Sequence, residues 1–158
     1  MNDSTTRAPW TPPLTAKAKG AVQRAVTAVL NELAPEREVK RASPVATRIE
    51  THRSPTGCVL QAATAAISVS WFASRDSAAG HGELQITVWR GIVAQRGANQ
   101  ERKGATIVAE QTVMPFTPSE GECVWRLADG AQCDSVALAA RCMALLEGEL
   151  RRLEVTSA

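Results

Sequence analysis

Apolar residues recur at steps of three and four near both ends of the chain, whereas between these ends they alternate with polar residues. The first pattern is typical of amphipathic helices, and the second is typical of strands with one buried face. The first helical segment starts near residue 14, ends at Pro35 and contains Leu14, Ala18, Val22, Val26, Val29, Leu30 and Leu33. The last starts near Asp134, a capping residue, and contains Leu138, Cys142, Leu145, Leu146, Leu150 and Leu153.

About five strands are predicted between the helices, over residues 45–51, 59–73, 83–93, 106–114 and 122–128. Turn signals separate them, including Ser54-Pro55-Thr56-Gly57 and Asp129-Gly130. Pro115 is expected to end the fourth strand. Arg90 interrupts the apolar face of the third strand, and a bulge at Gly91 could turn it outward.

This order predicts an α+β fold of two layers. Consecutive strands with short connections usually pair as antiparallel neighbours, so the sheet is expected to be mainly antiparallel. The N-terminal and C-terminal helices each have one apolar stripe, so both are expected to pack on one face of the sheet. We expect a flexible tail over residues 1–13, a single domain over 14–153 and a short C-terminal tail over 154–158.

Composition excludes several classes of protein. Hydrophobic residues make up 44% of the 158 residues, which is too many for a chain that is disordered throughout. The formal net charge is only +2, so charge alone implies neither a nucleic acid nor a membrane surface as partner. The sequence contains neither a secretory signal pattern nor an apolar run long enough to cross a bilayer. We therefore expect a soluble, cytoplasmic protein.

The sequence contains no common catalytic, nucleotide-binding or metal-binding motif. Gly80-His81-Gly82 precedes a predicted strand, whereas a phosphate cradle needs the start of a helix. His52 and Cys58 flank a turn, but they supply two metal ligands at most. We predict no metal and no cofactor, and we favour a protein that is not an enzyme.

Cys133 is the cysteine most suited to reactivity, because it precedes the predicted start of the last helix. The adjacent carboxylate of Asp134 opposes thiolate formation, and no histidine lies nearby in the sequence to act as a base. The alternatives are a reactive thiol and a small structural residue. The remaining cysteines, Cys58, Cys123 and Cys142, fall on strand or helix patterns typical of buried thiols.

The outward face of the predicted sheet is the candidate functional surface. It is expected to contain Ser68, Ser70, Phe72, Gln85, Thr87, Trp89, Val108, Glu110, Thr112, Glu122, Val124 and Arg126. Trp71 and Trp125 fall on the opposite parity and are expected in the core. Trp89, Phe72 and Val124 could form an apolar patch, which is typical of partner surfaces. The alternative is that the C-terminal or the N-terminal segment covers this face, and Trp10 with the proline-rich tail could do so.

These observations favour a protein-interaction module that acts through the outer sheet face or a sheet edge, with Trp89, Phe72, Val124, Arg126 and Glu110 as candidate contact residues. The partner would be another protein or a second copy of the chain. One alternative is a small-molecule-binding domain or enzyme, with a cleft between sheet and helices that uses Glu110, Arg126 or His81. A weaker alternative is single-stranded nucleic acid binding, which needs exposed aromatic and basic side chains together.

Overall fold

The computed structural model describes residues 15–35, 41–42, 48–75, 80–93 and 105–156. The expected N-terminal tail, 1–13, lies outside these residues. The helices are α1 (Ala16–Leu33) and α2 (Ser135–Thr156). The strands are β1 (Arg41–Ala42), β2 (Arg48–Ser54), β3 (Gly57–Gln61), β4 (Ala65–Ala73), β5 (Gly82–Arg90), β6 (Thr106–Ser119), β7 (Glu122–Arg126) and β8 (Gln132–Cys133).

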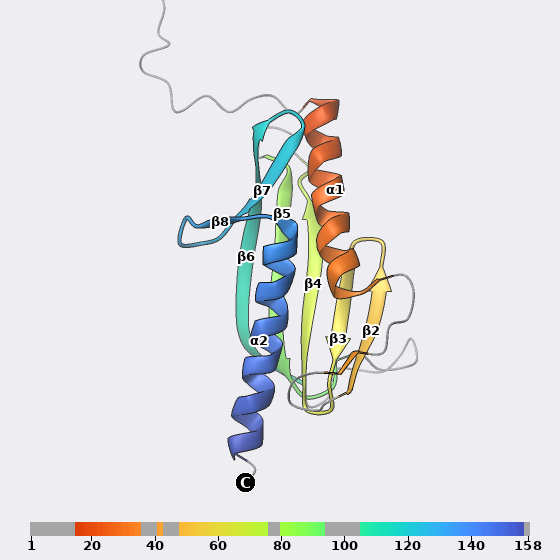
Figure 1. The fold of residues 1–158 in the computed structure, drawn as a ribbon, viewed down its shortest axis with the longest axis vertical. Helices are drawn as coiled ribbons and strands as arrows, with labels where there is room; N and C mark the ends of the chain where they lie inside the picture. Colours follow the sequence, from red (N-terminus) through yellow and green to blue (C-terminus); the bar gives the residue numbers. More distant parts are fainter. Residues whose placement is uncertain (1–14, 36–40, 43–47, 76–79, 94–104, 157–158) are drawn as a thin grey trace, which may run out of the picture.

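The strands form one curled sheet in which each strand pairs with the next along the chain, and every pairing is antiparallel. Both helices lie on the same side of this sheet, with α1 over its upper part and α2 over its lower part (Figure 1). The α+β class with an antiparallel sheet is therefore confirmed. The sheet has more strands than the five expected, partly because β1 and β8 have only two residues each.

The long strand expected over residues 59–73 is instead a hairpin of β3 and β4, and the expected single strand is wrong. Gln61 explains the break, because its side chain is buried and hydrogen-bonds around the turn. Its amide Nε2 donates to the carbonyl oxygens of Ala62 at 2.7 Å, Ala65 at 3.2 Å and Gly91 at 3.0 Å. Its Oε1 accepts a 2.9 Å bond from the backbone N–H of Val93.

Strand β6 does not end at Pro115, as the sequence had suggested, but continues to Ser119. Its pairing with β5 ends at Val113, and its pairing with β7 begins at Met114. Beyond Val113 the strand therefore has a described neighbour on one side only. A proline is compatible with such an edge position, because its missing N–H group removes no bond between strands there.

Arg90 stays on the helix-facing side of β5, so Gly91 does not turn it outward. Its guanidinium lies 3.5 Å from the carboxylate of Glu149 on α2, which is buried and also pairs with Arg152. The register shift in this part of the sheet lies one step earlier, between Val88 and Trp89 on β5, opposite β6.

Both helices begin at a side-chain cap, which satisfies backbone N–H groups that have no partner within the helix. Thr15 Oγ1 accepts a 3.0 Å bond from the N–H of Ala18, and Asp134 Oδ1 accepts a 2.8 Å bond from the N–H of Ala137. The expected cap at Asp134 is thus present. Helix α2 continues to Thr156, so residues 154–156 are helical rather than part of a tail.

The core lies between the sheet and the helices. Its largest fully buried side chains include Trp125, Leu30, Leu33, Leu60, Ile67, Leu84 and Leu146. Trp71 packs against this core, edge to face with Trp125, at 6.1 Å between ring centroids, so both tryptophans face inward as expected. In the described part of the chain, neither helix has the length and apolar character needed to span a bilayer.

Candidate interaction surface

The sheet face opposite the helices contains most of the residues singled out in the sequence. Directly paired residues of antiparallel strands point to the same face, so the register assigns each side chain to one side. Phe72 pairs with Glu83, and Thr87 pairs with Glu110. Their neighbours Trp71, Leu84 and Val88 alternate into the core, which places Phe72, Glu83, Thr87 and Glu110 on this outer face.

Trp89 is half-buried on the outer face, and its indole Nε1 donates a 2.9 Å hydrogen bond to Ser68 Oγ. Its cross-strand partners are Ala66 on β4 and Ile107 on β6. Because the register shifts here, Val88 pairs with Ala109 while Trp89 pairs with Ile107, which leaves Val108 as the extra residue of a bulge. The residue on the outer face opposite Trp89 is therefore Ile107, where sequence alternation had placed Val108.

Phe72 and Val124 lie at the other end of this face and do not join Trp89 in one patch. Phe72 is six residues along β4 from Ala66, the partner of Trp89, which separates them by about 20 Å. Val124 pairs with Phe116, and the guanidinium of Arg126 lies 4.3 Å from the centroid of the Phe116 ring. The outer face thus has two apolar regions, one around Trp89 and one around Phe116.

The charge of the outer face is mainly negative among the described residues. By strand alternation it includes the carboxylates of Glu50, Glu83, Glu110 and Glu122 and the guanidinium groups of Arg48 and Arg126. Phosphate backbones are attracted by clustered cations, so this face offers little electrostatic attraction for nucleic acid.

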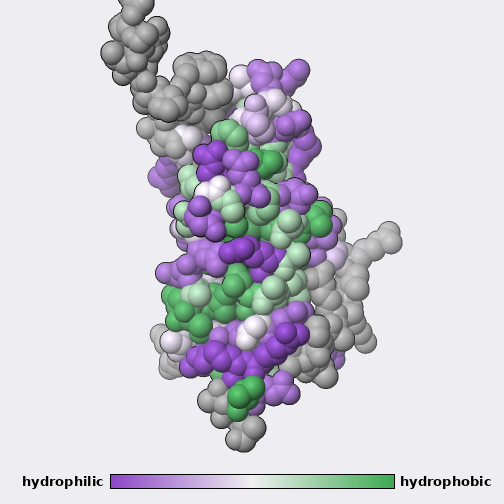
Figure 2. All heavy atoms as spheres, turned by 60° about the vertical axis from the view of Figure 1, so that its left-hand side comes forward, coloured by the Kyte–Doolittle hydropathy of each residue, from purple (hydrophilic) through white to green (hydrophobic). Residues whose placement is uncertain are grey.

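One edge of the sheet, along β6, lacks a described strand partner. No described strand pairs with the outer side of β6 over Thr106–Val113, because β7 pairs only beyond this segment. Ile107 is 47% exposed and Val108 is 40% exposed on this segment. Figure 2 brings this side of the molecule forward and shows hydrophobic side chains gathered in a band across its lower half. We name the segment Thr106–Val113, with Trp89 beside it, the β6 edge surface.

Of the residues proposed for a cleft between sheet and helices, only His81 faces the helices. Glu110 and Arg126 lie on the opposite, outer face. His81 lines a cavity between α1 and the hairpin that joins β4 to β5. Its side chain is half-buried.

Cys133 lies on β8, directly before α2, and is partly exposed. Burial and the charge of Asp134 raise the pKa of its thiol, against a smaller opposite effect of Arg141. Burial raises the pKa of Cys123 to about 11 and that of Cys142 to about 12. None of the four cysteines forms a disulfide. These shifts favour the protonated thiol at neutral pH.

His52 and Cys58 do not share a site. Cys58 pairs with Arg53 and is buried, whereas His52 pairs with Val59 and is exposed on the outer face. Across the described ranges, no group of three or more histidine, cysteine or acidic side chains is placed to hold a metal ion.

Ile107 was missed as a candidate contact residue. The reason is the bulge at Val108, which shifts Ile107 to the outer face. The local sequence does not indicate this bulge, since Thr106–Val113 contains neither a glycine nor a proline. Alternation counted from Val113 without the bulge assigns Ile107 to the core face.

Fold and surface together define an α+β protein with an antiparallel meander, two helices on one face and a segment of β6 that has a described strand neighbour on one side only. Comparison with protein-family models, with curated proteins and with solved structures found no match.

Proposed function

We propose that this chain is a non-enzymatic protein-interaction module that self-associates through the β6 edge surface. The observation that carries the proposal is the eight-residue segment Thr106–Val113, which has a described strand neighbour on one side only and exposes Ile107 and Val108. Unpaired N–H and C=O groups along a strand form a template for another strand. The apolar side chains beside them add burial to that pairing.

Proteins usually protect an open edge with lysine, proline, inward charges or bulges. Thr106–Val113 contains neither lysine nor proline, and both prolines of β6 lie beyond it, at 115 and 118. Its protective features are the bulge at Val108 and the single carboxylate of Glu110. These two features are few for a strand segment of this length, so the edge is weakly protected against pairing with another strand.

The proposed partner is a second copy of the chain. A two-fold dimer uses the same patch on both subunits, so one edge supplies both halves of the contact. Two β6 strands related in this way run antiparallel, as all pairs in this sheet do. Glu110 is the only charged side chain of the segment. The only like-charge pair that a two-fold contact must keep apart is therefore Glu110 and its copy in the second chain.

Oligomeric state in solution tests the proposal. Sedimentation or light scattering of the full chain is expected to show a monomer–dimer equilibrium across micromolar concentrations. Val108→Lys should raise the dimer dissociation constant by about tenfold or more, because lysine on an edge opposes strand pairing. Val136→Lys is the matched control, since Val136 is 60% exposed on α2, away from β6.

The two variants separate the outcomes. Dimers weakened by Val108→Lys and unchanged by Val136→Lys support the β6 edge surface. A monomer at all concentrations contradicts self-association, and dimers that survive Val108→Lys unchanged place the interface elsewhere.

A further inference from the structure

We propose that the cavity between α1 and the β4–β5 hairpin binds a small organic anion, with its carboxylate between Lys19 and His81 and its apolar body against Trp71. This site is on the helix side of the sheet and is separate from the β6 edge surface. The cavity has a volume of about 350 Å³ and is lined by Lys19, Val22, Gln23, Trp71, Ala73, Ser74, Arg75, Gly80 and His81.

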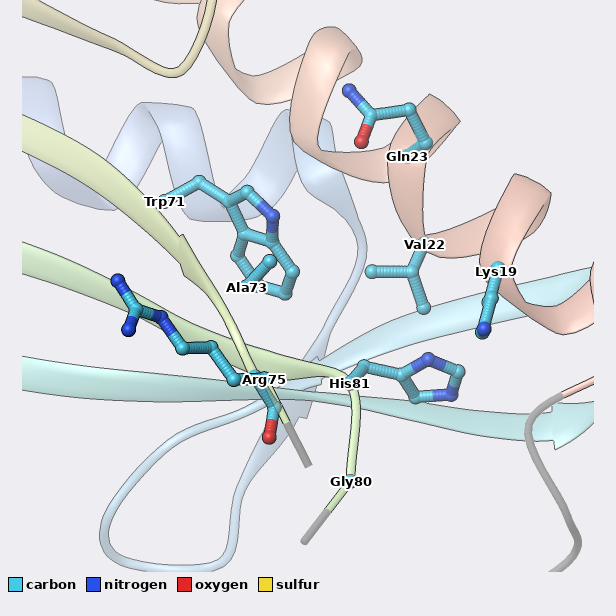
Figure 3. Close-up of a pocket in the computed structure, with 9 residues that line it drawn as sticks. Lys19, Val22, Gln23, Trp71, Ala73, Arg75, Gly80 and His81 are labelled. Carbon is cyan, nitrogen blue, oxygen red and sulfur yellow. The ribbon is translucent and has the colours of Figure 1, made fainter. Parts of the chain in front are cut away.

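Helix α1 supplies one wall of the cavity. Lys19, Val22 and Gln23 are three and four residues apart, so they lie on one face of the helix and line the cavity, and Lys19 and Val22 point toward the hairpin (Figure 3). Val22 is buried, whereas Lys19 and Gln23 are exposed, and Lys19 presents its ammonium to the cavity (Figure 3). The wall therefore combines an apolar base with polar groups at its rim.

The hairpin supplies the opposite wall and is closed by a 3.0 Å hydrogen bond from the N–H of Ser74 to the carbonyl of His81. Gly82 follows with φ of +140°, and a Cβ built there would lie 2.3 Å from the carbonyl oxygen of Phe72, so only glycine fits. This close approach fixes the point at which the chain enters β5, directly after His81. Figure 3 shows the His81 ring and the Lys19 ammonium directed toward one another, with Arg75 on the other side of Trp71.

Trp71 forms an apolar surface between these charged groups (Figure 3). The edge-to-face contact with Trp125, at an interplanar angle of 76°, holds its indole ring in place. A fixed aromatic surface favours a flat or branched apolar group, because little side-chain freedom is lost on binding.

The charge around the cavity selects an anion. Lys19 and Arg75 are cations, His81 is a third potential cation, and none of the described residues that line the cavity is acidic. No described carboxylate forms an ion pair with Lys19 or Arg75. The second cavity at α1 differs in this respect, because it has Glu120 beside Lys17 and Arg24.

The size and the lining residues of the cavity indicate which class of ligand it can bind. Pockets for small molecules commonly measure about 300–1,000 Å³ and combine apolar walls with a few polar groups. An inorganic anion would leave Trp71, Val22 and Ala73 without contacts. A carboxylate attached to an aromatic ring uses both parts of the lining, and benzoate is the simplest probe of that kind.

Binding should strengthen as the pH falls. Burial and the charge of Lys19 lower the pKa of His81 below its ordinary value. A bound carboxylate stabilises the imidazolium and raises that pKa, so by linkage the affinity increases as His81 takes up its proton. The charged group that faces His81 from α1 is Lys19, whereas the guanidinium of Arg75 on the hairpin lies on the other side of Trp71 (Figure 3).

Nuclear magnetic resonance titration of the full chain with benzoate tests the site. The chain has two histidines, so His81→Gln assigns the ring signals of His81, and Trp71→Phe assigns the indole of Trp71. Benzoate should shift both sets of signals with a dissociation constant of about 1 mM. Benzamide tests the apolar body without the charge, and sulfate tests the charge without the body; both should bind more weakly than benzoate.

Lys19→Gln and Lys17→Gln are a matched pair on α1, because they remove the same charge two residues apart. Lys19→Gln should weaken benzoate binding about three- to fivefold, and Lys17→Gln should leave it within a factor of about 1.5. The proposal is overturned if benzoate leaves the His81 and Trp71 signals unchanged at 20 mM. It is also overturned if benzamide binds as well as benzoate, or if both lysine variants have equal effects.

Discussion

The indole N–H of Trp125 donates a 3.0 Å hydrogen bond to the hydroxyl of Ser135, at the first residue of α2. The same hydroxyl donates a 3.0 Å bond to the backbone carbonyl of Ala25 on α1. One serine therefore connects β7 with both helices, although Ala25 lies 110 residues away in the sequence. This connection sets how the two helices meet above the sheet.

Ser135→Ala should lower the free energy of unfolding by about 1–3 kcal/mol, because it leaves the buried indole N–H of Trp125 without a partner. Urea unfolding followed by circular dichroism measures the change. Ser54→Ala is the control: the Ser54 hydroxyl is exposed and makes a long 3.4 Å contact with the carbonyl of Gly57. If both variants had the same stability as the wild type, the Ser135 hydrogen bonds would contribute nothing to the fold.

Gln61→Leu should be more damaging, at roughly 2–4 kcal/mol. The buried amide of Gln61 holds the β3–β4 turn and the backbone after β5 through four hydrogen bonds, and leucine can make none of them. Gln85→Leu, on the exposed outer face, should change stability by about 0.5 kcal/mol or less. Equal midpoints in urea for the two leucine variants would show that the Gln61 bonds contribute nothing.

Acid should destabilise the fold through His81. Because the folded protein lowers the pKa of His81 from 6.5, the unfolded chain binds the proton more readily just below that pH. The free energy of unfolding therefore falls as the pH falls through this window. His81→Gln should flatten the dependence of the urea midpoint on pH, measured between about pH 5 and pH 7. An unchanged slope in His81→Gln would refute the assignment.

Thiol labelling at pH 8 should modify Cys133 first and Cys142 only on unfolding, since a pKa of about 12 leaves the Cys142 thiol protonated. Even Cys133 should react more slowly than free cysteine, because burial and Asp134 raise its pKa. Asp134→Asn removes the charge and keeps a capping group, so it should accelerate the labelling. Labelling of Cys133 faster than free cysteine would instead support the reactive-thiol hypothesis.

The sequence was sufficient to predict that the two helices exist and that Trp71 and Trp125 face inward, because the periodicity of apolar residues determines both. The start of the last helix followed from a cap that acts locally, Asp134 with Ala137. The core positions of Trp71 and Trp125 followed from alternation within a strand. In each of these cases, the cause lies within a few residues of the feature.

The β3–β4 turn and the bulge of β6 were not predictable, because their causes lie elsewhere in the fold. The turn contains no glycine or proline, and Gln61 stabilises it by bonds that reach Gly91 and Val93. The β6 strand passes Pro115 because the pairing with β5 has already ended at Val113. Likewise, the cavity near His81 needs Lys19 and Trp71, which only the packing of α1 on the hairpin brings together.

Hydrogen exchange of β6 measured against protein concentration tests the central claim most directly. In dilute solution, backbone amides of Thr106–Val113 that face the open edge should exchange rapidly, because no described strand accepts their hydrogen bonds. At concentrations where the dimer forms, these amides should become protected, and Val108→Lys should abolish that gain while Val136→Lys preserves it. Protection that is the same at every concentration would contradict the proposed strand pairing between copies.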